Sequence, residues 1–173
     1  MIRTIQKDGS ILDLEENNEE LNKIFWHTTS HILAQAVKRL YPNTQLGIGP
    51  AIENGFYYDF KVEKPLTEED INKIEEEMKK IVKEDLALER STLSREEAIK
   101  LMKERNEPYK VQLIEELPEG EEISFFKQGE FIDLCAGPHI NRTGKVKALK
   151  LLSTSSAYWK GNQENDSMQR IYG

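Results

Sequence analysis

The sequence predicts an α+β fold, with a mixed, mainly antiparallel sheet packed with two long helices and one short helix. Segments with helical apolar spacing and short strand-like segments, bounded by glycine, proline and asparagine, follow one another irregularly. No regular strand–helix–strand repeat is present, which argues against a doubly wound parallel sheet. The 173 residues, 38% hydrophobic and 32% charged, suit one globular domain of ordinary size with a small extension.

The N-terminal third is expected to form a hairpin and a long helix. Residues 1–18 contain two apolar stretches around "KDGS", and an Asp-Gly pair in that position is a good hairpin signal. Residues 19–41 carry apolar side chains near helical spacing, and Pro42 follows the end of this helix. The next segment, "QLGIGPAIENGFYYDFKV", predicts two strands with a glycine-rich connection.

The middle of the chain predicts two helices that begin with capping boxes. Thr67 and Asp70 start the second long helix, and Ser94 and Glu97 start the short helix that ends near Arg105. Between the two helices, "ALERSTL" resembles a strand. Further strands are expected in "YKVQLI", in "ISFFKQGEFIDL" as a pair, and over residues 146–153 and 167–172.

Composition excludes several classes of protein. A net charge of −7 argues against a non-specific nucleic-acid binder, although residues 141–150 hold four basic side chains and no acid. That segment is either one basic face or a strand with solvated lysines. No apolar run approaches the roughly 20 residues of a membrane span. A single cysteine fits a reducing compartment, so we expect a cytoplasmic protein.

All the histidines and the only cysteine fall into two short pairs, "HTTSH" and "CAGPH". His27 and His31 are four residues apart, so they share one face of the predicted helix. The pair lacks the glutamate of the H-E-x-x-H motif, which argues against a metalloprotease. Cys135 and His139 flank a probable turn. The two pairs could bind zinc, line a catalytic pocket, or simply be buried core groups.

Other polar residues are candidates for the same site. Asp133 lies two residues before Cys135, so on a strand both side chains point to one side. Tyr57 and Tyr58 must point to opposite faces, and their spacing does not decide which one reaches a site. Lys110, expected at the start of a strand, could contact a carbonyl or phosphate oxygen, or could be an ordinary surface lysine.

Five ordered motifs carry a resemblance to a known family. They are "HTTSHILAQAVKRLYP", "IGPAIENGFYYDF", "EPYKV", "FIDLCAGPHI" and "LLSTSSAYWKGNQENDSMQRIYG". Together they resemble the editing domain of bacterial threonyl-tRNA synthetase over roughly residues 20–173. They are more distantly similar to the editing domain of alanyl-tRNA synthetase.

The resemblance implies hydrolysis of the ester in mischarged Ser-tRNA(Thr), through attack by water at the terminal adenosine. The implied catalytic residues are His27, His31, Lys110, Asp133, Cys135 and His139. Tyr58 is the implied substrate-binding residue. No cofactor is required on this interpretation. The alanyl relatives bind zinc through the same two motifs, so the alternative is a zinc ion at His27, His31, Cys135 and His139.

The resemblance also predicts domain organisation and partners. Residues 1–18 would be a shortened counterpart of a ubiquitin-like domain, and residues 19–173 the editing domain. Nothing matches the class II catalytic domain, so no ligase activity is expected from this chain alone. The expected partners are the serine-bearing acceptor end of tRNA(Thr) and that catalytic domain. Two alternatives stay open: a non-catalytic module that binds the tRNA acceptor, and a structural zinc-binding domain.

Overall fold

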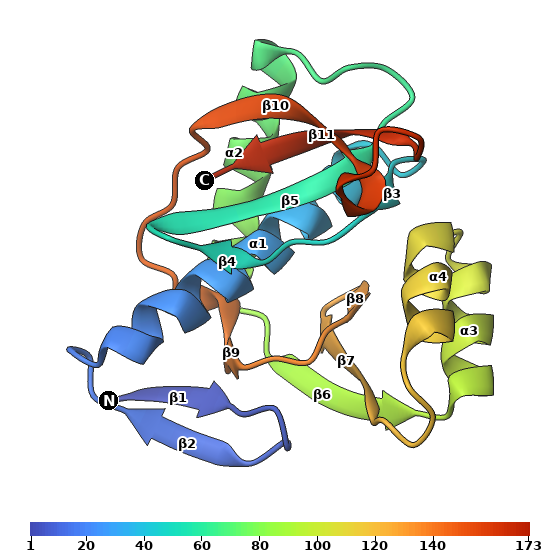
Figure 1. The fold of residues 1–173 in the computed structure, drawn as a ribbon. Coiled ribbons are helices and arrows are strands. Elements are labelled where there is room, and N and C mark those ends of the chain that lie inside the picture. Colours follow the sequence, from blue (N-terminus) through green and yellow to red (C-terminus); the bar gives the residue numbers. More distant parts are fainter.

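The computed structural model describes residues 1–173 and confirms the α+β class (Figure 1). The strands form three small sheets, and every pairing is antiparallel. The four helices are α1 (Glu19–Leu40), α2 (Glu68–Glu84), α3 (Arg95–Glu104) and α4 (Pro108–Glu116). The strands are β1 (Ile2–Ile5), β2 (Ile11–Leu14), β3 (Gln45–Leu46), β4 (Ala51–Ile52), β5 (Gly55–Lys61), β6 (Leu88–Leu93), β7 (Ile123–Gln128), β8 (Phe131–Leu134), β9 (His139–Ile140), β10 (Ser153–Tyr158) and β11 (Ser167–Tyr172).

The larger lobe combines the sheet β10-β11-β5-β3 with α1 and α2 (Figure 1). The α2 helix starts at the predicted capping box, in which Thr67 accepts from the Asp70 N–H and Asp70 accepts from the Thr67 N–H. The apolar faces of both helices and of the sheet contribute most of a core of 20 buried residues. Burial of these side chains is the main force that stabilises this lobe.

The smaller lobe combines the sheet β6-β7-β8 with α3 and α4 (Figure 1). The prediction of a strand at "YKVQLI" is wrong, because these residues form most of α4. Pro108 occupies the first helical position, where its missing N–H has no intrahelical partner to lose. Val111 and Ile114 are buried three residues apart, and they pack with the core beside α3.

The prediction of a strand over residues 146–153 is also wrong. The strand β10 begins only at Ser153 and pairs with β11 in an unbroken register from Ser153–Tyr172 to Tyr158–Ser167. The preceding residues remain irregular although Val146 and Leu151 are buried in the large core. The apolar residues of this segment are thus buried without forming a strand.

The predicted N-terminal hairpin is present and joins a segment from the far end of the chain. Strand β1 pairs with β2 on one side and with β9 on the other. In the second pairing Ile5 lies opposite His139, and Thr4 opposite Ile140. The hairpin therefore holds the backbone of the second histidine motif.

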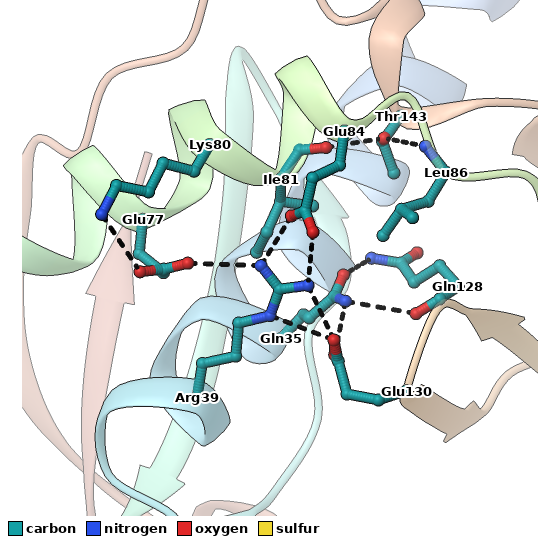
Figure 2. Close-up of polar contacts among 10 residues, drawn as sticks. All are labelled: Gln35, Arg39, Glu77, Lys80, Ile81, Glu84, Leu86, Gln128, Glu130 and Thr143. Carbon is teal, nitrogen blue, oxygen red and sulfur yellow. Dashed lines mark hydrogen bonds and ion pairs between the residues drawn. The ribbon is translucent and has the colours of Figure 1, made fainter.

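Helix α1 belongs to the larger lobe and also contacts residues of the smaller one (Figure 1). Polar residues recur on it at four-residue intervals: His27, His31, Gln35 and Arg39. The first contacts the loop after β8, and the other three contact residues of β7, β8 or the turn between them. Figure 2 shows the downstream half of this row, where Gln35 and Arg39 reach Gln128 and Glu130. We call this row the polar stripe of α1. No helix is long and apolar enough to cross a membrane.

Candidate active site between the lobes

The two histidine motifs meet at the upstream half of the polar stripe. The ring centroids of His27 and His31 are 5.2 Å apart, and the ring of His139 stacks on His27 at 4.3 Å. With Cys135 they offer four potential ligand atoms that all lie within 4.8 Å of one another. Segments more than 100 residues apart in the sequence are thus brought to one point.

The loop after β8 brings Cys135 and His139 to α1. The Cys135 sulfur lies 3.3 Å from Nε2 of His27 and 3.1 Å from Nε2 of His139, and it accepts the Gly137 N–H at 3.2 Å. Gly137 has φ +82°, and a Cβ on it would lie 3.1 Å from the ring of Phe126. Only glycine meets both conditions without strain.

Asp133 is a buried anchor next to this cluster. Its carboxylate accepts the Tyr58 hydroxyl at 2.6 Å and pairs with the Lys110 ammonium at 2.9 Å, and Nε2 of His31 lies 3.8 Å away. The exposed fraction of each of these four residues is 3% or less. Asp133 thus ties α1, α4 and β5 to β8.

The structure answers the question that the paired tyrosines leave open. Tyr58 is fully buried at Asp133, whereas the ring of Tyr57 lies on the other face of β5, 3.9 Å from the guanidinium carbon of Arg170. Gly49 makes room for the inward tyrosine, since a Cβ there would fall 2.0 Å from the Tyr58 ring. The tyrosine that the resemblance selects is therefore the one that reaches the cluster.

Burial sets the protonation states of the site. It lowers the pKa of His31 to about 3, and it also lowers the pKa values of His27 and His139. It raises the pKa of the Cys135 thiol to about 12. Near neutral pH the cluster is therefore three neutral imidazoles and a neutral thiol.

The carboxyl group of Asp133 behaves differently from its neighbours. Burial alone would raise its pKa, but the charge of Lys110 and hydrogen bonds from Tyr58 and Lys110 hold the pKa below its ordinary value. The same burial, together with the Asp133 charge, raises the pKa of Tyr58 well above its ordinary value. Asp133 is thus an anion paired with a cation, and Tyr58 is a neutral hydrogen-bond donor.

All seven residues selected from the sequence come together here: His27, His31, Tyr58, Lys110, Asp133, Cys135 and His139. Lys110 reaches the site from α4 and not from a strand. Two buried polar atoms of these residues have no hydrogen-bond partner, Nδ1 of His31 and Oδ1 of Asp133, and only the second lies in an ion pair, with Lys110. A buried polar atom of this kind is a natural contact for a bound molecule.

Residues that the sequence motifs did not single out support the cluster. Thr28 and Ser30 lie inside "HTTSH", and both are fully buried: Thr28 contacts Nδ1 of His139 at 2.8 Å, and Ser30 donates to the Gly49 carbonyl at 2.8 Å. Phe126 packs edge-on against the His139 ring at 4.4 Å. For Thr28 and Ser30, the only signal in the sequence was their position between the two histidines of one motif.

The side chains of the cluster are also of the types that bind metal ions. Imidazole nitrogens and a cysteine sulfur are usual zinc ligands, and here His27, His31, Cys135 and His139 would hold the ion. Binding would require loss of the thiol proton and would replace the contacts that the sulfur makes with both neighbouring rings.

The basic segment of residues 141–150 lies away from the cluster and is partly neutralised. Arg142 pairs with Asp85 at 3.0 Å, and Lys150 lies 3.4 Å from Glu75. Lys145 and Lys147 border a groove of about 470 Å³ with apolar walls that include Phe25, Trp26, Phe56 and Leu149. The charges of this segment therefore do not enter the histidine cluster.

Comparison with known proteins finds sequence similarity to aminoacyl-tRNA synthetases. Residues 123–172 match the family described as the threonyl and alanyl tRNA synthetase second additional domain. This match covers β7 to β11, and so includes Asp133, Cys135 and His139.

Similar proteins extend the relationship to the whole chain. The threonine–tRNA ligase of Caldanaerobacter subterraneus is 66% identical over 98% of the chain, and that of Acetivibrio thermocellus is 67% identical over 98%. The Clostridium tetani threonine–tRNA ligase is 60% identical over the full chain. The chain spans only 26–27% of the length of these relatives. Over nearly its whole length it is thus similar to one region of these threonine–tRNA ligases, and the family match lies within that region.

Proposed function

We propose that this chain is an aminoacyl-tRNA editing domain that hydrolyses the ester of Ser-tRNA(Thr). The observation that supports the proposal most is the convergence of seven residues from five segments at one buried cluster. The chain's similarity to threonine–tRNA ligases supports an aminoacyl-tRNA as the substrate class. In the longer protein, its partners would be the acceptor end of tRNA(Thr) and a class II catalytic domain.

The chemistry of the cluster suits ester hydrolysis by water. Water adds to the carbonyl carbon, and the bond to the ribose oxygen then breaks with transfer of a proton to that oxygen. A neutral imidazole can accept a hydrogen bond from the attacking water and so orient it, and Nδ1 of His31 has no other partner. The ammonium of Lys110 supplies positive charge where the carbonyl oxygen becomes negative. No step needs a cofactor.

A second site for serine has a simple physical purpose. A synthetic pocket that accommodates threonine cannot strongly reject serine, because one missing methyl group changes selectivity only about 10- to 200-fold. An editing pocket can use the opposite rule and exclude threonine by the bulk of its methyl group. Rigid walls favour such exclusion, and the walls here are buried and mutually hydrogen-bonded.

The decisive measurement is deacylation of Ser-tRNA(Thr) and Thr-tRNA(Thr) by this chain. We expect hydrolysis of the first and retention of the second. His27→Ala should slow the reaction about 100-fold or more, whereas Lys23→Ala, an exposed position on the same helix, should not. Equal hydrolysis of both substrates, or of neither, would contradict the proposal. Binding of tRNA without hydrolysis would identify a non-catalytic acceptor-binding module instead.

The four clustered donor atoms favour one second candidate, a structural zinc site that fastens α1 to the loop after β8. Stoichiometric zinc in the purified protein, together with unfolding on its removal, would support this candidate. A fold that persists after treatment with a chelator, with no zinc present, would exclude it.

A further inference from the structure

The hydroxyl of Thr28 makes two hydrogen-bond contacts with the strand that carries His139. Its side chain is fully buried between the two histidines of α1. Its Oγ1 accepts the N–H of Ile140 at 3.2 Å and lies 2.8 Å from Nδ1 of His139. Unlike the neighbouring Thr29, it does not donate to a carbonyl of its own helix.

The direction of the contact with His139 follows from the inventory of donors and acceptors. The hydroxyl of Thr28 has one hydrogen, and the Ile140 N–H can only donate. The remaining partner is Nδ1 of His139, so the hydroxyl is satisfied only if it donates there. A buried hydroxyl without an acceptor would carry an uncompensated desolvation cost.

We infer that the Thr28 hydroxyl holds the neutral His139 imidazole in its Nε2–H tautomer, and so directs a chain of hydrogen bonds through Cys135 to His27. The Nε2–H of His139 then points at the Cys135 sulfur, 3.1 Å away. The Gly137 N–H donates to the same sulfur at 3.2 Å.

The contacts of His27, at the other end of this chain of hydrogen bonds, independently require the same direction. Nδ1 of His27 lies 3.2 Å from the Pro138 carbonyl oxygen, which can only accept. Neutral His27 therefore carries its proton on Nδ1 and leaves Nε2 as an acceptor. That atom lies 3.3 Å from the Cys135 sulfur, where it takes the S–H hydrogen bond.

The directed chain gives different roles to the groups of the cluster. The sulfur of Cys135 accepts two hydrogen bonds and donates one, so its position is fixed and the thiol is retained. His31 stays outside this hydrogen-bond chain, and its buried Nδ1 has no partner in the protein. Thr28 is thus a positioning residue that acts through His139, and its effect on hydrolysis rests on the proposed editing function.

The tautomers can be read directly by NMR of ¹⁵N-labelled histidine side chains in protein dialysed against EDTA at neutral pH. Only three histidines are present, and His27→Gln and His31→Gln assign their signals by subtraction. We expect Nε2–H for His139 and Nδ1–H for His27. In Thr28→Val, which keeps the side-chain shape, His139 should lose the pure Nε2–H pattern, whereas Thr28→Ser should retain it.

An Nδ1–H pattern for His139 in the unsubstituted protein would overturn the inference, as would an unchanged pattern in Thr28→Val. If Thr28→Val does not fold, the unsubstituted protein and Thr28→Ser still decide it, because both must show Nε2–H. In deacylation assays, Thr28→Val should lower kcat about 10- to 100-fold without changing KM, and Thr28→Ser should restore it. Absence of deacylation in the unsubstituted protein would contradict the proposed function and leave the tautomer result intact.

Discussion

The polar stripe of α1 has the same residue spacing in its upstream half, His27 and His31, and in its downstream half, Gln35 and Arg39. The two halves differ in how completely their polar atoms are hydrogen-bonded. Downstream, Gln35 donates to the Gln128 carbonyl at 3.2 Å and to Glu130 at 2.6 Å, and it accepts from the Gln128 amide at 2.8 Å. Arg39 pairs with Glu77, Glu84 and Glu130 (Figure 2). Upstream, His31 keeps an unpartnered nitrogen.

The difference shows how one helix face can serve both structure and chemistry. The downstream half ties α1 and α2 to the turn between β7 and β8, and the polar atoms of Gln35 and Arg39 are paired with protein atoms, although Oε1 of Gln128 is buried without a partner. The turn is thereby fixed only a few residues before Asp133. The upstream half can then hold its histidines in position while Nδ1 of His31 makes no hydrogen bond within the protein. Four variants or treatments test this division, beginning with the largest expected effect.

Lys110→Met tests the ion pair that stabilises the upstream half. It leaves the Asp133 carboxylate buried without its cation, so the free energy of unfolding in urea should fall by about 3–5 kcal/mol. Adding Asp133→Asn should recover part of the loss, because the unpaired charge is then removed. Lys23→Met, at an exposed site, is the control and should change stability little. Equal stability of all three variants would contradict the role of the pair.

Gln35→Ala tests the downstream half. It leaves the buried Gln128 amide without an acceptor, and the free energy of unfolding should fall by about 1–3 kcal/mol. Gln163→Ala, an exposed change of the same kind, should be neutral in the same urea titration. A neutral Gln35→Ala would show that the paired half of the stripe does not stabilise the junction of the lobes.

Arg39→Met should change the response of stability to acid. Burial acts to raise the pKa of Glu130, but hydrogen bonds from Arg39 and Gln35 hold it below the ordinary 4.5. This carboxylate therefore stabilises the fold above pH 4.5, and its contribution is lost as pH falls through its lowered pKa. Between roughly pH 6 and pH 3, the variant should therefore lose less stability than the parent. The difference should be under about 1 kcal/mol, because Glu130 is partly exposed to solvent. Urea midpoints for the parent, Arg39→Met and the exposed control Lys127→Met measure the difference, and parallel curves would contradict it.

Removal of metal should have no effect. The upstream cluster is already connected by internal hydrogen bonds, so treatment with EDTA should leave both the urea midpoint and the deacylation rate unchanged. Re-addition of zinc gives the complementary measurement. A rate that falls with EDTA and returns with zinc would show that the four ligand atoms hold a required ion.

The success of the sequence predictions depended on whether local residues determine the structure. The hairpin, the two long helices and the short helix were confirmed because their signals are local: an Asp-Gly turn, capping residues and apolar periodicity. The strand predicted at "YKVQLI" was wrong because alternating residues there also fit a helix. Packing against α3, with Pro108 at the first position, selects that helix.

Predicting the site needed knowledge of contacts between distant segments. Residue type and spacing identified His27, His31, Asp133 and Cys135 as candidates, and the family resemblance selected Tyr58 over its neighbour. The role of Thr28 could not be read from the sequence, because it depends on the backbone of a strand 112 residues away. Similarly, the position of Lys110 follows from the packing of α4 and not from its own neighbours.

The pairing of β1 with β9 determines how this protein can be divided. The sequence suggests a boundary near residue 18, yet the strand that carries His139 takes its only strand partner from the first five residues. A shorter version that begins at residue 19 would leave this two-residue strand as a free edge directly behind the cluster. The smallest unit worth expressing therefore includes the hairpin, whatever its ancestry.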